Sequence, residues 1–207
     1  MENWRKYLNE GIDSRIQNQI DKFLANKDMY ITIHTLWHST KDIMYTDAEG
    51  NLLRSQDHKK MGLVRMKYNV HKQYDNCLGE ETWVVTNTNA LEGMGPLLYE
   101  VAIEYASQNG NGLIADRYSI SSDAHEVWSK YALRSDVERK QLDISKAMPG
   151  VPEQYPQITP NEPDDDCYQG SAVKWSGKDW NKSPLSSIFS KNNTSVTDAI
   201  SSKLIIK

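Results

Sequence analysis

The sequence has little cysteine, no long hydrophobic run and no excess of positive charge, and each absence excludes a class of protein. Only Cys77 and Cys167 occur among 207 residues, far apart and without a CxxC pair, so a disulfide framework or a cysteine-rich zinc site is excluded. No stretch approaches the roughly 18 apolar residues of a membrane helix, and residues 1–6 lack the apolar core of a signal peptide. We therefore expect a protein of a reducing cytoplasm, with no membrane partner.

Positive charge is not in excess either, because 24 Lys and Arg stand against 28 Asp and Glu, for a net charge of −4. A general nucleic-acid binder needs a broad positive field, and this balance argues against one. Hydrophobic residues make up 38% of the chain, yet 6 Trp and 11 Tyr supply large apolar surfaces for a core. The chain is therefore expected to fold around a core that does not use its whole length.

Proline is scarce until Met148 and frequent after it. Six of the seven prolines follow that residue, together with the acidic run at 164–166. We interpret residues 1–27 as a helical segment, residues 28–147 as the core, and residues 148–207 as a Pro-rich connector and C-terminal arm. Trp175 and Trp180 lie among lysines in this arm, and we expect them to anchor it on a protein partner or a second copy rather than on nucleic acid.

Hydrophobic periodicity predicts an alternation of strands and helices. Apolar residues at helical spacing predict a helix over 12–24, and β-rich or alternating runs predict strands over 29–33, 63–70 and 82–86, with a hairpin turn around Gly50. A helix is expected after Pro96, a short buried strand over 112–115, and a second helix from Ser122 or Asp123, with Glu126 completing a capping box. Residues 137–144 fit a strand or a helix end. This order is that of an α/β fold.

The run Gly93-Met94-Gly95-Pro96 follows a predicted strand and opens a predicted helix. Glycines allow close approach of a ligand to the backbone, and the N–H groups of a helix start attract anions such as phosphate. The run is not a dinucleotide fingerprint, because Leu98 occupies the third glycine position, and it lacks the Gly-Lys-Ser/Thr of a Walker A loop. Taken alone, such a turn is more often a tight connection than a binding loop.

The surroundings of this turn resemble the core of the GCN5-related N-acetyltransferase superfamily. In that family a turn written Arg/Gln-x-x-Gly-x-Gly/Ala holds the pyrophosphate of acetyl-CoA, and the next helix but one carries Asn-x-x-Ala-x-x-x-Tyr-x-x-x-Gly-Phe. Gly93, Gly95 and Ala124 fit these patterns. The sequence departs from them at Ala90, Ser121, Trp128, Ala132 and Leu133. The resemblance covers residues 63–133, about a third of the chain, and implies a mixed, mainly antiparallel central sheet flanked by helices.

The resemblance also implies roles for individual residues. The backbone of Val84 and Val85 would hold the pantetheine arm of acetyl-CoA, and Gly93, Met94, Gly95 and Pro96 would hold its pyrophosphate. Trp128 stands where the family often has the tyrosine that protonates the thiolate, so Tyr131, one helical turn further on, is the candidate acid. Glu81, or its neighbour Glu80, is the candidate base. The alternative interpretation is that Tyr131 is a core tyrosine and that Glu81 and Glu80 lie in a solvated turn.

Two further interpretations follow from the sequence. His34 and His38 have a spacing that could serve a metal, but the β-rich run before them and the lack of a third ligand argue against it. The departures from the family pattern leave open a GCN5-related domain that has lost catalysis and serves as a binding or assembly subunit. The whole chain is similar to GCN5-related proteins of tailed phages, some of which are virion components, which would place it in a host cytoplasm or a virion.

Overall fold

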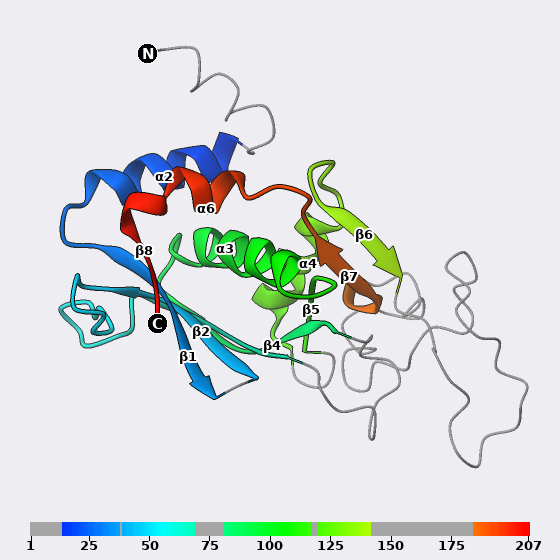
Figure 1. Ribbon diagram of the computed structural model, residues 1–207, viewed down its shortest axis with the longest axis horizontal. Coiled ribbons are helices and arrows are strands. Elements are labelled where there is room, and N and C mark those ends of the chain that lie inside the picture. Colours follow the sequence, from blue (N-terminus) through cyan, green and yellow to red (C-terminus); the bar gives the residue numbers. More distant parts are fainter. Residues whose placement is uncertain (1–13, 38, 69–80, 117–119, 142–183) are drawn as a thin grey trace, which may run out of the picture. The chain divides into compact units, whose positions relative to one another are not determined.

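The computed structural model describes residues 14–37, 39–68, 81–116, 120–141 and 184–207 (Figure 1). In these residues the chain forms an α/β fold with four α-helices and an eight-stranded, mixed but mostly antiparallel open sheet, in the order β6-β7-β5-β4-β3-β2-β1-β8. The helices are α2 (Ser14–Ala25), α3 (Gly95–Gln108), α4 (Ser122–Tyr131) and α6 (Ser195–Ala199). The strands are β1 (Tyr30–Trp37), β2 (Thr40–Thr46), β3 (Gly62–Tyr68), β4 (Trp83–Ala90), β5 (Leu113–Ile114), β6 (Glu138–Gln141), β7 (Ser187–Ser190) and β8 (Leu204–Ile206).

The chain divides into two compact units, and the first comprises Met1–Lys67, Asn87–Tyr105 and Lys191–Lys207. Its strands β1, β2 and β3 are antiparallel neighbours, with Ile43 of β2 opposite Ile33 of β1 and Val64 of β3. Strand β8 pairs with the other edge of β1 in parallel register. Ile31 and Ile33 of β1, Ile43 of β2 and Val64 of β3 are almost fully buried, as expected for β-branched residues in the core of a sheet.

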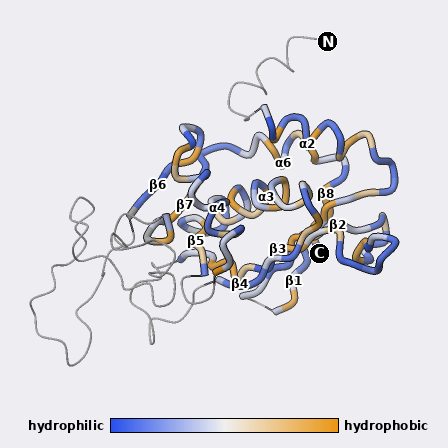
Figure 2. Tube along the Cα trace, turned by 180° about the vertical axis from the view of Figure 1, so that it is seen from behind, coloured by the Kyte–Doolittle hydropathy of each residue, from blue (hydrophilic) through white to orange (hydrophobic). Residues whose placement is uncertain are grey.

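Helix α2 packs on this unit through one face. Its turns alternate between hydrophobic and hydrophilic residues (Figure 2), and Ile16, Ile20 and Phe23 are the buried ones. Phe23 contacts the ring of Tyr45 on β2, with 6.1 Å between the ring centroids. Helix α6 runs beside α2 in both views (Figures 1 and 2), and Lys203, which follows it, lies over the Phe23 ring. The predicted N-terminal helix is thus confirmed over its described residues.

The second unit comprises Tyr68–Thr86 and Ala106–Ser190. Strand β5 pairs in parallel with the start of β4, at Trp83 and Val84, and antiparallel with β7 at Phe189. Strand β7 also pairs antiparallel with β6, so it lies between β5 and β6. The core of this unit is aromatic, because Phe189 contacts Trp128 of α4 at 5.2 Å between ring centroids.

Most predicted elements are confirmed, and three differ. Strand β2 was not expected, because its residues mix Lys and Asp with Ile, Met and Tyr, yet the Gly50 turn follows it as predicted. Residues 138–141 form strand β6 rather than a helix end. The predicted capping box is wrong: Ser121 caps α4 by accepting a hydrogen bond from the Ala124 N–H, and Glu126 pairs with Lys130 instead.

The end of the chain differs most from the expectation of an arm. From Pro184 onward the structure adds β7, α6 and β8 to the two units, and Leu185, Phe189, Val196 and Ile200 are fully buried. The sequence concealed this because each apolar group is only a few residues long and is surrounded by Ser, Asn and Lys. Pairing with distant strands, which local periodicity does not encode, stabilises these short elements. Trp175 and Trp180 lie outside the described residues.

Candidate functional site

Two side chains of the first unit bind the backbone carbonyl groups of the loop between β4 and α3. The Tyr45 hydroxyl, on β2, donates a hydrogen bond of 3.0 Å to the Met94 carbonyl oxygen, and Gln19 Nε2, on α2, donates one of 3.3 Å to the Gly93 carbonyl oxygen. Burial raises the pKa of Tyr45 well above its usual value, so the phenol stays protonated and remains a donor. The carbonyl groups of Gly93 and Met94 are therefore already engaged by the protein.

The helix start that follows the loop is open to a ligand by its chemistry. Helix α3 begins at Gly95, its first turn contains no acidic residue, and the preceding Met94 has no side-chain oxygen that could cap it. The N–H groups of a first helical turn have no acceptor within the helix, and the helix dipole places partial positive charge there. Pro96 fits this turn because it has no N–H group of its own that would need an acceptor. This end of α3 can thus accept a small anionic group.

The two glycines of the loop differ in their surroundings. Gly93 is exposed and has a φ of +78°, and a Cβ at this position would meet no atom within 4 Å. A Cβ at Gly95 would meet only the Cβ of Ala90, at 3.7 Å, which is ordinary contact. Ala90 therefore lies next to the loop, and its methyl group stands where the resemblance implies an Arg or Gln donor.

The remaining candidate residues belong to the second unit. Val84 is half-buried and pairs with Ile114, and Val85 is buried. Glu81 is exposed with a φ of +60°, and its carbonyl oxygen accepts a hydrogen bond of 2.7 Å from the Asn111 N–H. This geometry is that of a turn at the surface, as in the alternative interpretation of Glu81.

The structure brings Trp128 and Tyr131 together in the aromatic core of the second unit. Trp128 is 1% exposed and Tyr131 is 5% exposed, and their ring centroids lie 6.2 Å apart. Phe189 contacts both rings, and the Arg134 guanidinium lies over the Tyr131 ring at 5.1 Å. These surroundings are those expected for core aromatics. The role of Tyr131 as acid stays a prediction.

Sequence reasoning found the glycine loop but missed the side chains that hold it. Gln19 and Tyr45 lie 74 and 49 positions from the carbonyl groups they bind, and no motif links them to the loop. Of the two histidines considered for a metal, His34 is on β1, which extends beyond the predicted strand over 29–33, and His38 lies outside the described residues. In the described part of the chain, no three His, Cys, Asp or Glu side chains gather as a metal site requires.

Comparison of the chain with protein-family models, with curated proteins and with solved structures gave no match. Among the helices of the described segments, none combines the length and the apolar character needed to cross a bilayer.

Proposed function

We propose that the protein binds the pyrophosphate of an acyl-coenzyme A at the start of α3. The observation that carries this proposal is the loop from Gly93 to Pro96: its carbonyl groups are engaged by Gln19 and Tyr45, while the first turn of α3 has no acidic residue. Oriented N–H groups and a helix dipole without a carboxylate to complement them favour an anionic ligand. Within that class, the resemblance favours a GCN5-related N-acetyltransferase that acts on an amine.

The order of elements supports the more specific proposal. Strand β4, the glycine loop, α3, β5 and α4 follow one another as the resemblance implies. Strands β4 and β5 are parallel, and their pairs are Trp83 with Leu113 and Val84 with Ile114. From Thr86 to Ala90 the side chains of β4 are exposed. In the proposal, the backbone of Val84 and Val85 holds the pantetheine arm.

In the proposed reaction, acetyl-CoA would supply a thioester, and the amine nitrogen would form a bond to its carbonyl carbon as the carbon–sulfur bond breaks. The protein would take one proton from the amine and give one to the departing thiolate. Tyr131 is the proposed donor and Glu81 the proposed acceptor. Trp128 is the proposed neighbour of the thiol, because an indole N–H can donate a hydrogen bond but not a proton.

Thermal unfolding with and without acetyl-CoA tests the binding proposal. A ligand at a hundred times its dissociation constant stabilises a protein by about 2.7 kcal/mol, which is seen as a rise in Tm. Gly95→Ala should keep this rise, since its Cβ has room and the family pattern accepts Ala there. Gly95→Val should keep the fold and lose the rise, because its additional methyl groups would stand at the helix start.

The two variants form a matched pair, because both place the same Cβ at a position without backbone strain. Absence of a rise for the unmodified chain at millimolar acetyl-CoA would reject the proposal. An equal rise for Gly95→Val would show that acetyl-CoA binds elsewhere.

A second candidate function is a GCN5-related binding or assembly subunit without catalysis, for example a phage virion component. The observation that favours it is the burial of Trp128 and Tyr131 in a packed aromatic core. Its partner would be a protein or a second copy of the chain, contacted through Trp175 and Trp180. If this candidate is correct, the protein transfers no acetyl group from acetyl-CoA to any of a panel of amines. An assay for the free thiol that such a transfer releases would then detect none.

A further inference from the structure

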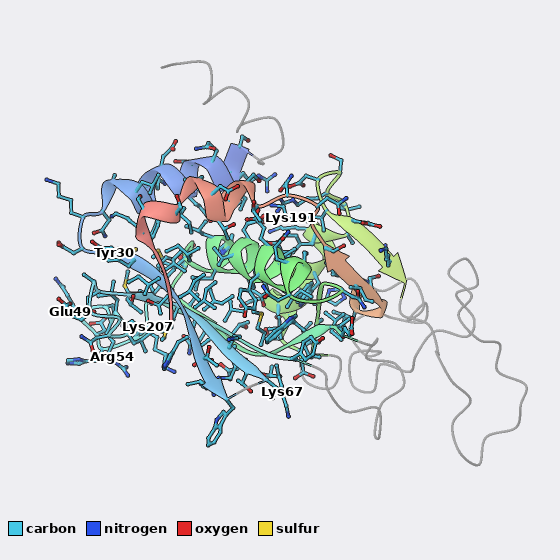
Figure 3. The ribbon with its side chains drawn as sticks, viewed as in Figure 1. Tyr30, Glu49, Arg54, Lys67, Lys191 and Lys207 are labelled. Carbon is cyan, nitrogen blue, oxygen red and sulfur yellow. The ribbon has the colours of Figure 1, made fainter. Side chains whose placement is uncertain are left out.

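Three charged side chains are buried together in the first unit, and none of them takes part in the proposed site. Lys191 Nζ lies 3.1 Å from Glu100 Oε2 and 2.8 Å from Glu104 Oε1, and all three side chains are 0% exposed. Glu100 and Glu104 are one turn apart on α3, and Lys191 opens the last segment of the unit (Figure 3). Groups of this kind remain buried only when they are closely paired and hydrogen-bonded.

Glu104 binds more than the lysine. Its carboxylate also accepts hydrogen bonds from the Val196 N–H at 3.0 Å, the Thr197 N–H at 2.8 Å and the Thr197 hydroxyl at 2.9 Å. These two N–H groups belong to the first turn of α6, whose own preceding residue, Thr194, makes no side-chain cap. A five-residue helix is not stable alone, so α6 depends on this carboxylate from α3.

The far end of the same segment is held by backbone pairing. Residues Leu204, Ile205 and Ile206 of β8 pair with β1, and Lys207 exchanges backbone hydrogen bonds with Ile33 and Thr35. Strand β8 has only three residues, and Ile206 is 69% exposed. Figure 3 shows Lys191 and Lys207 at the two ends of this segment.

We propose that Lys191–Lys207 is a strap that leaves and rejoins the first unit as one body, and that the contact of Glu104 with Lys191 and Thr197 is its latch. Through the latch, one carboxylate of α3 binds both the buried ammonium group of Lys191 and the first turn of α6, and neither would keep its place in the core without it. When it opens, α6 loses the acceptor for its first turn, and β8 is left as a three-residue edge strand. Release of the strap leaves the outer edge of β1 unpaired, where an extended chain can add.

Amide hydrogen exchange measured by mass spectrometry on the full chain tests the strap. Lys191→Met removes the ammonium group that pairs with Glu100 and Glu104, and exchange in residues 191–207 and at the Thr35 amide, which binds Lys207, should rise by about a hundredfold or more, while β2 and β3 keep their protection. The milder Thr197→Val removes one bond to Glu104 and should raise exchange in the same residues by a smaller factor. Arg65→Met is the matched control, because it breaks an ion pair with Asp42 in the same unit but outside the strap.

A synthetic peptide of residues 191–207, carrying a fluorescent label and the natural Lys191, provides a second readout. It should bind the full-length Lys191→Met protein, in which the place of the strap is vacant part of the time, and bind the unmodified protein at least tenfold more weakly. The same peptide with Met in place of Lys191 should bind neither protein. Exchange that rises evenly over the first unit, or stays unchanged in both variants, would overturn the proposal, as would a global loss of fold in Lys191→Met with an unaltered strap in Thr197→Val.

Discussion

Gly93 and Gly112 have positive φ angles, of 78° and 122°, but for different reasons. At Gly93 the space beside the backbone is open, so only the backbone conformation favours glycine. At Gly112 a Cβ would lie 2.6 Å from the Phe189 carbonyl oxygen on β7, so the close approach of another chain segment excludes a side chain as well. Glycine is therefore favoured at position 93 by the backbone conformation alone, and at position 112 also by packing in the second unit.

This difference predicts the cost of an added methyl group at each position. Gly93→Ala should lower the free energy of unfolding by about 1–2 kcal/mol, the cost of a left-handed conformation for a residue with a Cβ. Gly112→Ala should cost at least as much, because its φ of 122° lies beyond the left-handed minimum, and it also forces the backbone of Phe189 to move, which adds about 1–3 kcal/mol. Denaturation in urea would measure both. Equal losses for the two variants would contradict the contact between Gly112 and β7.

At the scale of single elements, α4 owes its start to one hydroxyl group. Ser121 has an extended backbone, and its Oγ accepts a hydrogen bond of 3.2 Å from the Ala124 N–H. Ser121→Ala should lower the free energy of unfolding by about 1 kcal/mol, the usual cost of losing a cap. Ser122→Ala, one residue further on and equally exposed, should change it by less than about 0.5 kcal/mol. If both variants lose the same amount, Ser121 is not the cap.

The elements that the sequence predicts are those whose residues carry their own periodicity. Helices α2, α3 and α4 and strands β1, β3 and β4 are of this kind, and so is the glycine loop before α3. Strands β2, β7 and β8 are not, because they are short or carry charged residues and form by pairing with strands far along the chain. The same holds for the site: the loop is visible in the sequence, whereas Gln19 and Tyr45 reach it only in three dimensions.

At the scale of the whole molecule, both units depend on residues near the end of the chain. A chain that stops after Ser183 lacks Leu185 and Phe189, which are fully buried, and lacks the strand between β5 and β6. It should show no cooperative unfolding transition in urea. A chain that stops after Ser190 retains β7 and should keep a fixed near-ultraviolet circular dichroism from the aromatic core of the second unit. A full transition in the shorter chain would instead support an arm.

The position of β7 between β5 and β6 also governs when the protein can fold during synthesis. The ribosome makes β5, α4 and β6 before β7, the strand that lies between β5 and β6. Leu113, Trp128 and Tyr131 therefore lack their contacts with Phe189 until that residue has been synthesised. A nascent chain in that state exposes apolar surface that the finished protein buries. Chaperones that bind nascent chains should therefore associate with it until Phe189 has emerged, and a stall before residue 190 should leave it open to proteolysis.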